Sequence, residues 1–343
     1  MRYHPLLDRW VILAPDRRGR PTDQKDRYLP RVQECPFCPG RESSTPPALY
    51  TVPPPSESGG DGAWRIRVFP NKYPALQPKS ADHGNASEKG GAPRELFLSR
   101  EGVGRHEVIV ETPEHREDFP DFEQDHLHDV LTVWAGRIRA AYQEQDLAYA
   151  LLFRNHRARA GASLSHPHSQ LIATPVIPKN IRQKCEASQA YLERNNRCLI
   201  CDLLKQEGKA GSRVILETEE FIVFAPFASR FPFEIFIAPK THNPDFTLSS
   251  AENMGQLAAL LKDMLCRLRE ILDDPPYNLV VNTAPNAKHL PRELKHQPPE
   301  RYFHWHIEVL PRLAKAAGFE WGSGFHINAV PPEEAASRLR EVN

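Results

Sequence analysis

The sequence predicts an α+β fold made of two similar units in tandem, each a mainly antiparallel sheet with packed helices. The chain has 343 residues, more than one hydrophobic core usually holds, so two domains are expected. One order of motifs also occurs twice, which a duplicated α+β unit explains with the fewest assumptions. In each copy a Cys-x-x-Cys pair precedes a single histidine and then a His-x-His pair: Cys35, Cys38, His115, His166 and His168, then Cys198, Cys201, His242, His304 and His306.

Strands are expected on either side of these histidines. Apolar runs that end in proline follow the two His-x-His pairs, at 171–174 and 307–310. Other apolar runs precede the single histidines, at 107–110 and 233–238. Short apolar runs bounded by turn residues are typical of buried strands.

Two long amphipathic helices are expected at 125–143 and 250–272, because apolar residues recur there at spacings of three, four and seven. Ser249 or Ser250 can cap the second helix, and the run from Asp273 to Pro276 ends it. The polar segment 184–195 reads as a linker helix. We therefore expect an N-terminal domain at 1–178 and a C-terminal domain at 179–343.

Composition narrows the class of protein. The chain carries 44 basic and 44 acidic residues, and this zero net charge argues against nucleic acid as the main partner. No segment has the length and apolarity to span a membrane, and the N-terminus has no apolar run of signal-peptide length, so we expect a cytoplasmic protein without a membrane partner. In such a chain, paired Cys-x-x-Cys motifs favour metal binding over disulfides.

Each repeat offers four ligands of the kind that structural zinc prefers. The sets are Cys35, Cys38, His115 and His166 in the first repeat, and Cys198, Cys201, His242 and His304 in the second. A full four-ligand set leaves no position for water, so such a zinc would hold the fold rather than take part in chemistry. Two alternatives remain open: only the cysteine pairs bind metal, or some of the sites have decayed.

The segment that ends His166-Pro167-His168-Ser169-Gln170 is the candidate site of chemistry. In a strand these two histidines and the glutamine would share one face, roughly 6–7 Å apart. One imidazole could attack phosphorus while its neighbours hold the nucleophile and the oxygens. Taken alone, a His-x-His pair is more often a metal-ligand pair or a chance surface feature. If zinc holds His166, however, His168 stays free and neutral, as a nucleophile at pH 7 must be.

The chain resembles the galactose-1-phosphate uridylyltransferase family, within the histidine-triad superfold, nearly from end to end. The resemblance implies two histidine-triad-like domains. It is carried by these segments: 9–15, 17–21, Cys35-Pro-Phe-Cys38, 69–76, 111–115, the His-Pro-His-x-Gln motif, 231–234 and 304–306.

The resemblance also implies a mechanism and roles for particular residues. His168 would attack the α-phosphorus of a nucleotide sugar and expel hexose 1-phosphate, and a second sugar phosphate would then collect the nucleotide. No metal would be needed for this chemistry. The family further implies a homodimer whose active site borrows residues from the partner. The remaining roles are Gln170 and Ser163 on phosphoryl oxygens, Asn155 near the leaving group, Arg17 and Arg20 near phosphate, and Asn71 in the nucleotide pocket.

Two departures from the best-described bacterial members leave the substrate open. Those members end with a Gly-Tyr-Glu segment whose glutamate holds sugar hydroxyls, whereas here the region 318–324 has glycine in the place of that glutamate. Those members build their second metal site from Glu and His, whereas this chain offers Cys198 and Cys201, as do the similar ADP-glucose phosphorylases. Three functions are therefore weighed: a hexose-1-phosphate uridylyltransferase, an adenylyl-transferring phosphorylase on the same scaffold, and a zinc-stabilised nucleotide-binding or nucleic-acid-binding module without turnover. The neutral charge and the absence of a basic stripe count against the third.

Overall fold

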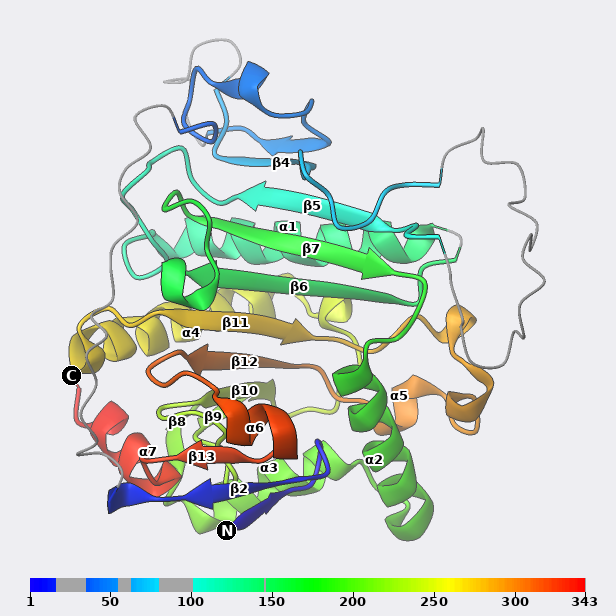
Figure 1. Cartoon of the computed structure of the whole chain (residues 1–343), viewed down its shortest axis with the longest axis vertical. Helices are drawn as coiled ribbons and strands as arrows, with labels where there is room; N and C mark the ends of the chain where they lie inside the picture. Colours follow the sequence, from blue (N-terminus) through cyan, green and yellow to red (C-terminus); the bar gives the residue numbers. More distant parts are fainter. Residues whose placement is uncertain (17–34, 55–62, 80–100, 145, 343) are drawn as a thin grey trace.

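The computed structural model describes residues 1–16, 35–54, 63–79, 101–144 and 146–342, and its main feature is one ten-stranded sheet that both halves of the chain share (Figure 1). In spatial order the strands are β3 (Tyr50–Val52), β4 (Ile66–Pro70), β5 (Arg105–Val110), β7 (His168–Thr174), β6 (Tyr149–His156), β11 (Tyr277–Asn282), β12 (His306–Pro311), β10 (Ile235–Pro239), β9 (Phe221–Phe224) and β8 (Val214–Glu217). The two halves join where β6 pairs antiparallel with β11.

The strand order shows the duplication directly. Read outward from the β6–β11 junction, the first half runs β6, β7, β5, β4, β3 and the second runs β11, β12, β10, β9, β8. All pairings within this sheet are antiparallel, and the register repeats as well. Val108 lies opposite Gln170 and Phe69, just as Phe236 lies opposite Glu308 and Phe224. The α+β class with two similar units is therefore confirmed, while the boundary at 178/179 stays a prediction.

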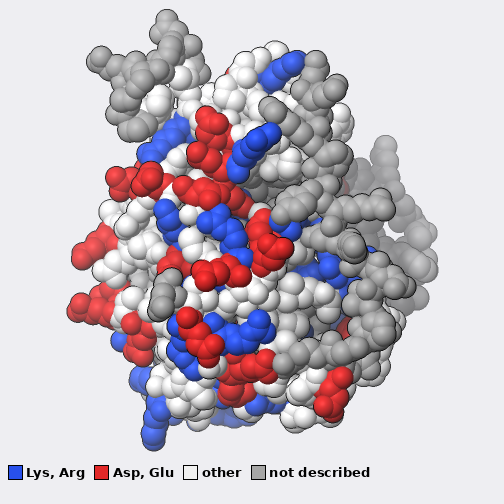
Figure 2. All heavy atoms as spheres, turned by 90° about the vertical axis from the view of Figure 1, so that its left-hand side faces the viewer, with Lys and Arg blue, Asp and Glu red and all other residues white. Residues whose placement is uncertain are grey.

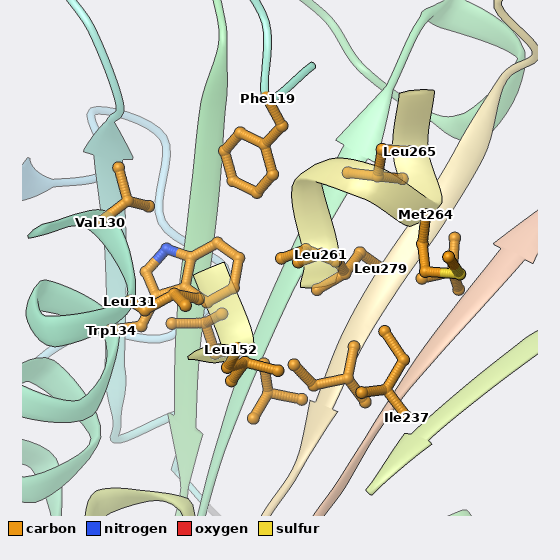
Figure 3. Packing of buried hydrophobic residues seen from close by; sticks show 14 of the residues in the cluster. Phe119, Val130, Leu131, Trp134, Leu152, Ile237, Leu261, Met264, Leu265 and Leu279 are labelled. Atoms are coloured by element: carbon orange, nitrogen blue, oxygen red, sulfur yellow. The ribbon is translucent and has the colours of Figure 1, made fainter. Parts of the chain in front are cut away.

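Two long helices cover one face of the sheet, α1 (Gln124–Gln143) and α4 (Ala251–Leu272), close to the bounds that their apolar periodicity predicts. The Ser250 side chain accepts the Asn253 N–H at the start of α4, and Asp273 ends it in a left-handed conformation (φ 55°). The apolar stripes of both helices meet the inward side chains of the strands in one continuous core (Figure 3). It includes Val130, Trp134 and Ile138 of α1, Leu261, Met264 and Leu265 of α4, and Leu152, Leu171, Leu279 and Ile307 of the sheet.

The opposite face of the sheet carries both His-x-His motifs. In the second half this face is covered by a three-stranded sheet of β1 (Arg2–His4), β2 (Arg9–Leu13) and β13 (His326–Asn328), as Figure 1 shows at the bottom of the view. The remaining helices are α2 (Lys179–Asn195), α3 (Leu199–Ala210), α5 (Pro299–Tyr302), α6 (Gly318–Ser323) and α7 (Pro332–Arg340), with 3-10 turns at Glu42–Ser44, Ala158–Ala160, Phe246–Leu248, Ala287–His289 and Arg292–Leu294.

The strands expected beside the histidines are present. They lie within β5, β7, β12 and β10, although β10 begins at Ile235 rather than at residue 233 because Phe233 has a positive φ of 60°. The linker helix expected at 184–195 is longer, since α2 begins at Lys179. Among the described residues, no helix combines the length and apolarity needed to cross a membrane.

Candidate functional site

Four side chains that are far apart in the sequence form the first cysteine-histidine cluster. The ligand atoms of Cys35, Cys38, His115 and His166 all lie within 4.8 Å of one another. Nδ1 of His166 is 3.7 Å from Cys35 Sγ and 3.6 Å from Cys38 Sγ, and Nδ1 of His115 is 3.3 Å from Cys38 Sγ. The outer nitrogens are also held: Nε2 of His166 lies 2.8 Å from the Thr112 carbonyl oxygen, and Nε2 of His115 lies 2.9 Å from Ser165 Oγ.

The second cluster repeats this arrangement. Nδ1 of His242 and Nδ1 of His304 lie 3.3 Å and 3.4 Å from Cys201 Sγ, and Cys198 completes the set. The Nε2 atoms point to the Glu300 and Pro239 carbonyl oxygens at 2.8 Å and 2.9 Å. The structure therefore brings together all eight metal ligands that the sequence predicts, in two sets of four.

The geometry of both clusters fits a tetrahedral ion. Zinc–sulfur and zinc–nitrogen bonds of ordinary length place sulfur and nitrogen about 3.6 Å apart. The measured separations of 3.3–3.7 Å agree with that spacing. Histidines that bind metal through one nitrogen typically donate the other N–H to a carbonyl or hydroxyl oxygen, as three carbonyls and Ser165 allow here.

His168 is positioned by the chain that leads out of the first cluster. It is the first residue of β7, two residues after His166, and it is only 5% exposed. Its Nδ1 lies 2.8 Å from the His166 carbonyl oxygen, so Nδ1 carries the proton and Nε2 keeps its lone pair. Burial lowers the pKa of His168 to about 4, which leaves the ring neutral at pH 7. The ring packs edge-on against Phe37 with centroids 5.3 Å apart.

The matching histidine of the second half is in a different state. Nδ1 of His306 lies 2.9 Å from the His304 carbonyl oxygen, as in the first half. Its Nε2, however, accepts a hydrogen bond from Lys184 Nζ at 2.9 Å. The lone pair that is available on His168 is therefore engaged on His306, and only the first half retains an imidazole suited to nucleophilic attack.

Gln170 is held by a histidine that the sequence analysis did not identify. The Ala75 N–H donates to Nδ1 of His106 (3.1 Å), so Nε2 of His106 carries the proton and donates to Gln170 Oε1 (2.9 Å). This fixes the glutamine amide with its N–H groups free to donate elsewhere. Asn71 lies beside the same ring, with Nδ2 at 3.1 Å from Nε2 of His106. The register of β5 against β7 brings these side chains together, a long-range pairing that a local motif cannot show.

A change at His106 should therefore act through Gln170. We expect His106→Phe, which keeps a ring but loses the N–H, to lower kcat for group transfer by about 10-fold to 100-fold, because an unfixed donor stabilises the transition state less well. The measurement is steady-state transfer alongside thermal unfolding. Tyr73→Phe, at a highly exposed neighbouring ring, is the matched control with unchanged kcat. An unchanged kcat in the folded His106 variant would contradict the role.

A cavity of about 490 Å³ lies over His168. Asn155 lines it, and its Oδ1 accepts from Asn278 Nδ2 at 2.7 Å. Ser163 is exposed on the loop before β7 and is not among the lining residues, whereas Ser165 is. Arg17 and Arg20 lie outside the described residues. The predicted roles of these residues therefore stay predictions. The lining comprises 115–118, 120, 121, 154–157, 164–168, 269 and 274.

A charged network forms the floor of the cavity. Arg154 is buried; its Nε donates to Glu111 Oε2 at 2.9 Å, and it also contacts Asp118 and the Tyr277 hydroxyl. His156 lies between two carboxylates, 2.7 Å from Asp118 and 2.8 Å from Asp274. Burial opposes protonation of His156, but Asp118 and Asp274 raise its pKa. The Arg154 guanidinium thus lies beneath the cavity and is held by fixed carboxylates.

Replacing Arg154 by methionine should destabilise the fold by about 3–5 kcal/mol, because it leaves the buried Glu111 carboxylate without its partner. Burial already raises the pKa of Glu111 to about 7, and losing the arginine removes an interaction that lowers it. A carboxyl whose pKa is higher in the folded than in the unfolded protein lowers the free energy of unfolding as pH rises. This loss begins near the unfolded pKa of about 4.5 and continues until pH passes the folded pKa. Urea unfolding at pH 5.5 and pH 8 measures the free energy of unfolding that the variant loses relative to wild type, and this loss should be larger at pH 8. An equal loss at the two pH values would contradict the role given to Glu111.

Charge on the surface is mixed. On the face shown in Figure 2, the acidic and basic side chains of the described residues are interspersed, and those coloured side chains form no continuous basic band. This agrees with the balanced composition of 44 basic and 44 acidic residues.

Comparison with known proteins defines the class: the relatives of this chain are nucleotidyltransferases, and the chain is an enzyme of that type. It belongs to the galactose-1-phosphate uridyl transferase family, whose N-terminal domain matches residues 1–178 and whose C-terminal domain matches residues 184–343.

Individual relatives cover the whole chain. It is 36% identical to an ADP-glucose phosphorylase of Arabidopsis thaliana, in an alignment that covers 100% of this chain and 93% of the relative. It is 32% identical to a galactose-1-phosphate uridylyltransferase of Thermotoga maritima, with 100% of this chain and 98% of the relative covered. Among solved structures, the Arabidopsis ADP-glucose phosphorylase with bound ADP-glucose superposes with a TM-score of 0.81 at 34% identity, with 100% of this chain and 98% of that chain covered. A uridylyltransferase structure gives 0.71 at 29% identity, with 99% and 96% covered.

Proposed function

We propose that the protein is a hexose-1-phosphate uridylyltransferase that works by ping-pong transfer through a covalent nucleotidyl-histidine on His168. The observation that carries the proposal is the state of this ring: its Nδ1 bonds to the His166 carbonyl oxygen, and its neutral Nε2 belongs to a residue that lines the 490 Å³ cavity. The family to which the chain belongs supports the same reaction class.

The reaction follows from that geometry in two displacements. Nε2 of His168 attacks the α-phosphorus of UDP-glucose; the phosphorus–nitrogen bond forms as the bond to the bridging oxygen breaks, and glucose 1-phosphate leaves. A phosphate oxygen of galactose 1-phosphate then attacks the same phosphorus, the phosphorus–nitrogen bond breaks, and UDP-galactose leaves with the histidine regenerated. One phosphate linkage replaces another, so the exchange is near energetic balance. Positioning and fixed donors therefore matter more than acid–base help.

Donors for the phosphoryl oxygens are assigned as follows. Gln170, oriented by His106, presents its amide N–H groups, and Asn155 lies at the cavity beside the leaving group. Ser163, Arg17, Arg20 and Asn71 take the roles that the family resemblance implies, with Asn71 placed beside His106 and Gln170. The active site is completed by a second copy of the chain in a cytoplasmic homodimer.

Zinc is the metal that suits both clusters. Two thiolates and two imidazoles at tetrahedral spacing are a structural zinc set, and four protein ligands leave no open position for substrate. Bound zinc would supply structural stability and no step of the reaction. In the first half it would fix His166, and therefore the start of β7 and the position of His168.

A second function, adenylyl transfer from ADP-glucose to phosphate, is favoured by one specific observation. The second cluster contains Cys198 and Cys201, which resembles the ADP-glucose phosphorylases, and the Arabidopsis member is 36% identical to this chain. Both functions use the same nucleophile. They differ in the base that the pocket accepts and in the acceptor.

Intact-protein mass spectrometry separates the two functions. The protein is mixed with UDP-glucose or with ADP-glucose in the absence of acceptor. A uridylyl adduct is the expected result, and release of that adduct by galactose 1-phosphate completes the first proposal. An adenylyl adduct released by inorganic phosphate would assign the second function instead. No adduct with either donor, on folded and metal-loaded protein, would overturn the covalent mechanism.

A further inference from the structure

A hydrogen-bonded pair of asparagines links the two halves of the chain beside the nucleophile. Asn155 lies near the end of β6 and Asn278 near the start of β11, directly opposite each other in the antiparallel pairing that joins the halves. On the other side of β6 the ladder pairs Arg154 with Ser169, so the next position along it places His168 beside Asn155. His168, Asn155 and Asn278 therefore form one row across three neighbouring strands, with their side chains on the same face of the sheet.

The side-chain amide of Asn278 has its nitrogen fully engaged. Its Nδ2 donates to Asn155 Oδ1 at 2.7 Å and to the Ala160 carbonyl oxygen at 2.7 Å. A carbonyl oxygen only accepts, so the atom of Asn278 that faces Ala160 is the nitrogen and not the oxygen. The same nitrogen requires an acceptor at Asn155. The Asn155 amide is therefore fixed with Oδ1 toward Asn278 and Nδ2 turned away from it.

The Asn155 nitrogen that is turned away remains available to a ligand. Asn155 lines the His168 cavity and is half-buried, and its Nδ2 donates to no group among the described residues. Gly161 lies next to it: a Cβ at that position would be 3.5 Å from Nδ2, and the glycine has a φ of 101° that side chains rarely adopt. The glycine thus leaves this donor uncovered.

The turn that follows Asn155 has a strained backbone and depends on neighbouring contacts. Arg157 has a φ of 67° and a ψ of 161°, a combination found almost only in glycine. Its guanidinium pairs at 2.5 Å with Asp274, in the segment that leads into β11, and its carbonyl oxygen accepts the Ala160 N–H at 3.1 Å. Strained backbone persists only where its surroundings hold it. The start of β11 and the residues before it therefore hold this turn, and with it the place of Asn155.

The second half has a matching asparagine that is bound differently. In the pairing of β11 with β12, Asn282 lies opposite His306, as Asn155 lies beside His168 in the first half. Asn282 Oδ1 accepts from Lys184 Nζ at 2.9 Å, and the same lysine nitrogen lies 2.9 Å from Nε2 of His306. One lysine therefore binds both the asparagine and the histidine of the second half.

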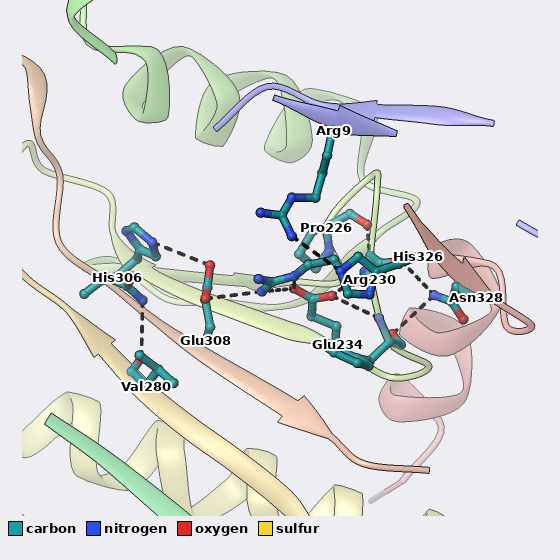
Figure 4. Close-up of polar contacts among 12 residues, drawn as sticks. Arg9, Pro226, Arg230, Glu234, Val280, His306, Glu308, His326 and Asn328 are labelled. Atoms are coloured by element: carbon teal, nitrogen blue, oxygen red, sulfur yellow. Dashed lines mark hydrogen bonds and ion pairs between the residues drawn. The ribbon is translucent and has the colours of Figure 1, made fainter. Parts of the chain in front are cut away.

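An ion-pair network lies beside His306 and extends this arrangement (Figure 4). Glu308 lies 3.8 Å from Nε2 of the ring and 3.2 Å from Arg230, and Arg230 also pairs with Glu234 at 2.6 Å. The asparagine of this half thus belongs to a closed, charged network. The asparagine of the first half instead keeps a free donor beside a free nucleophile, because an asparagine from the other half holds its oxygen.

We propose that Asn278 is a positioning residue for nucleotidyl transfer, an inference that rests on the function proposed for His168. By holding Asn155 Oδ1, it directs Asn155 Nδ2 to a phosphate oxygen of the departing hexose 1-phosphate. Negative charge grows on that phosphate as the bond from the α-phosphorus to the bridging oxygen breaks. A fixed donor there stabilises the transition state more than the bound substrate. In this role Asn278 acts through Asn155 and touches no substrate atom.

Two donors with different leaving groups test the proposal on the full-length, metal-loaded protein. UDP-glucose releases glucose 1-phosphate, whereas the imidazolide of UMP transfers the same uridylyl group and releases imidazole, which has no phosphate oxygen and takes its proton from water. We expect Asn278→Ala to slow adduct formation about 10-fold to 30-fold with UDP-glucose but less than about threefold with the imidazolide. Intact mass followed over time measures both rates. Equal slowing with the two donors, or no slowing with UDP-glucose, would overturn the proposal.

The wild-type protein separates this inference from the function on which it rests. ADP-glucose and the imidazolide of AMP are used in the same way where ADP-glucose is the donor that labels His168. If wild type forms no adduct with any of these donors, the covalent mechanism fails and the positioning role fails with it. If wild type is labelled and only the comparison at Asn278 fails, the mechanism stands and the positioning role is wrong.

A double-mutant cycle shows whether Asn278 acts through Asn155. Asn155→Ala should slow adduct formation from UDP-glucose about 100-fold, and adding Asn278→Ala should slow it by less than a further factor of about two. Effects that multiply would mean that Asn278 works independently of Asn155, contrary to the proposal.

Two further variants guard against a purely structural effect. Asn278→Asp has nearly the size of asparagine and serves in the same comparisons if the alanine variant does not fold. Its carboxylate accepts from Asn155 and draws Nδ2 away from the phosphate, so the rate with UDP-glucose should fall further than with alanine. Asn282→Ala, at the matching place of the second half, is the control and should keep adduct formation within about twofold of wild type. A loss as large as that of Asn278→Ala would show that any lost polar contact in the central strands slows the reaction, and the specific role of Asn278 would be refuted.

Discussion

Replacing His168 by alanine is expected to lower the rate of nucleotidyl transfer by on the order of 10⁴-fold or more and to abolish the covalent adduct. The reason is chemical: the ring supplies the nucleophile, and no other described side chain at the cavity offers a neutral imidazole with a free lone pair. Removing the nucleophile of a covalent mechanism generally costs this much, because the remaining groups only bind and orient the substrate. Steady-state transfer and intact mass after exposure to UDP-glucose and ADP-glucose measure both effects.

The second copy of the motif supplies the matched control. His306 has the same backbone hydrogen bond as His168, but its Nε2 accepts from Lys184. We expect His306→Gln to keep transfer within a few-fold of wild type and to lower the free energy of unfolding by about 1–3 kcal/mol, because the buried His306 ring that stacks on Phe236 is lost. A folded His168→Ala protein that still forms the adduct would contradict the assignment, as would an adduct lost only from His306→Gln.

The two halves thus differ by a few polar residues on one framework. Where the first half has Gln170 held by His106, the second has Glu308 bound by Lys184 and Arg230. A buried carboxylate with two cations is a satisfied network, and it replaces the groups that would handle phosphate. The three-stranded sheet of β1, β2 and β13 covers the face that carries the second His-x-His motif. Duplication supplied two sites, and local substitutions leave one with a free nucleophile.

Local patterns were sufficient to predict the elements. The apolar periodicity at 125–143 and 250–272 gave helices close to the observed bounds, since burial of one stripe against a sheet repeats at the helical period. The pairing of β6 with β11 was not foreseen. It depends on which edge strands of the two units meet, and that is settled by contacts between residues more than 120 positions apart.

The candidate site was likewise predicted in part: some of its residues were identified from the sequence and others were missed. All eight cluster ligands were identified because cysteine and histidine spacing is visible along the chain. His106, Arg154 and His156 were missed, since single charged or imidazole side chains carry no local signal. One hint was available: each lies on a strand next to a motif already singled out, with His106 one residue before the 107–110 run and Arg154 beside Asn155.

The first cysteine-histidine cluster should show the second large effect. Replacing Cys35 and Cys38 together by serine removes both thiolates, and we expect the zinc content to fall from two ions per chain to one. Structural zinc contributes on the order of 10 kcal/mol in small domains. Here the cluster ties the segment at 35–38 to His115 and to the start of β7, while the strands themselves remain paired with the second half. A loss of several kcal/mol, concentrated in the first half, is therefore expected.

That loss should reach the chemistry through His166. Without a metal on its Nδ1, His166 keeps its contact with the Thr112 carbonyl oxygen and its edge-on ring contacts with Phe37 and His115, but the strand that begins at His168 loses its metal anchor. Adduct formation should consequently fall at least 100-fold even at temperatures where the variant is folded. Elemental analysis, urea unfolding and intact mass report the three effects separately. Cys266→Ser, outside both clusters, should change none of them. If the double variant keeps two zinc ions, or forms the adduct at the wild-type rate, then the first cluster neither binds zinc through these thiolates nor positions the nucleophile.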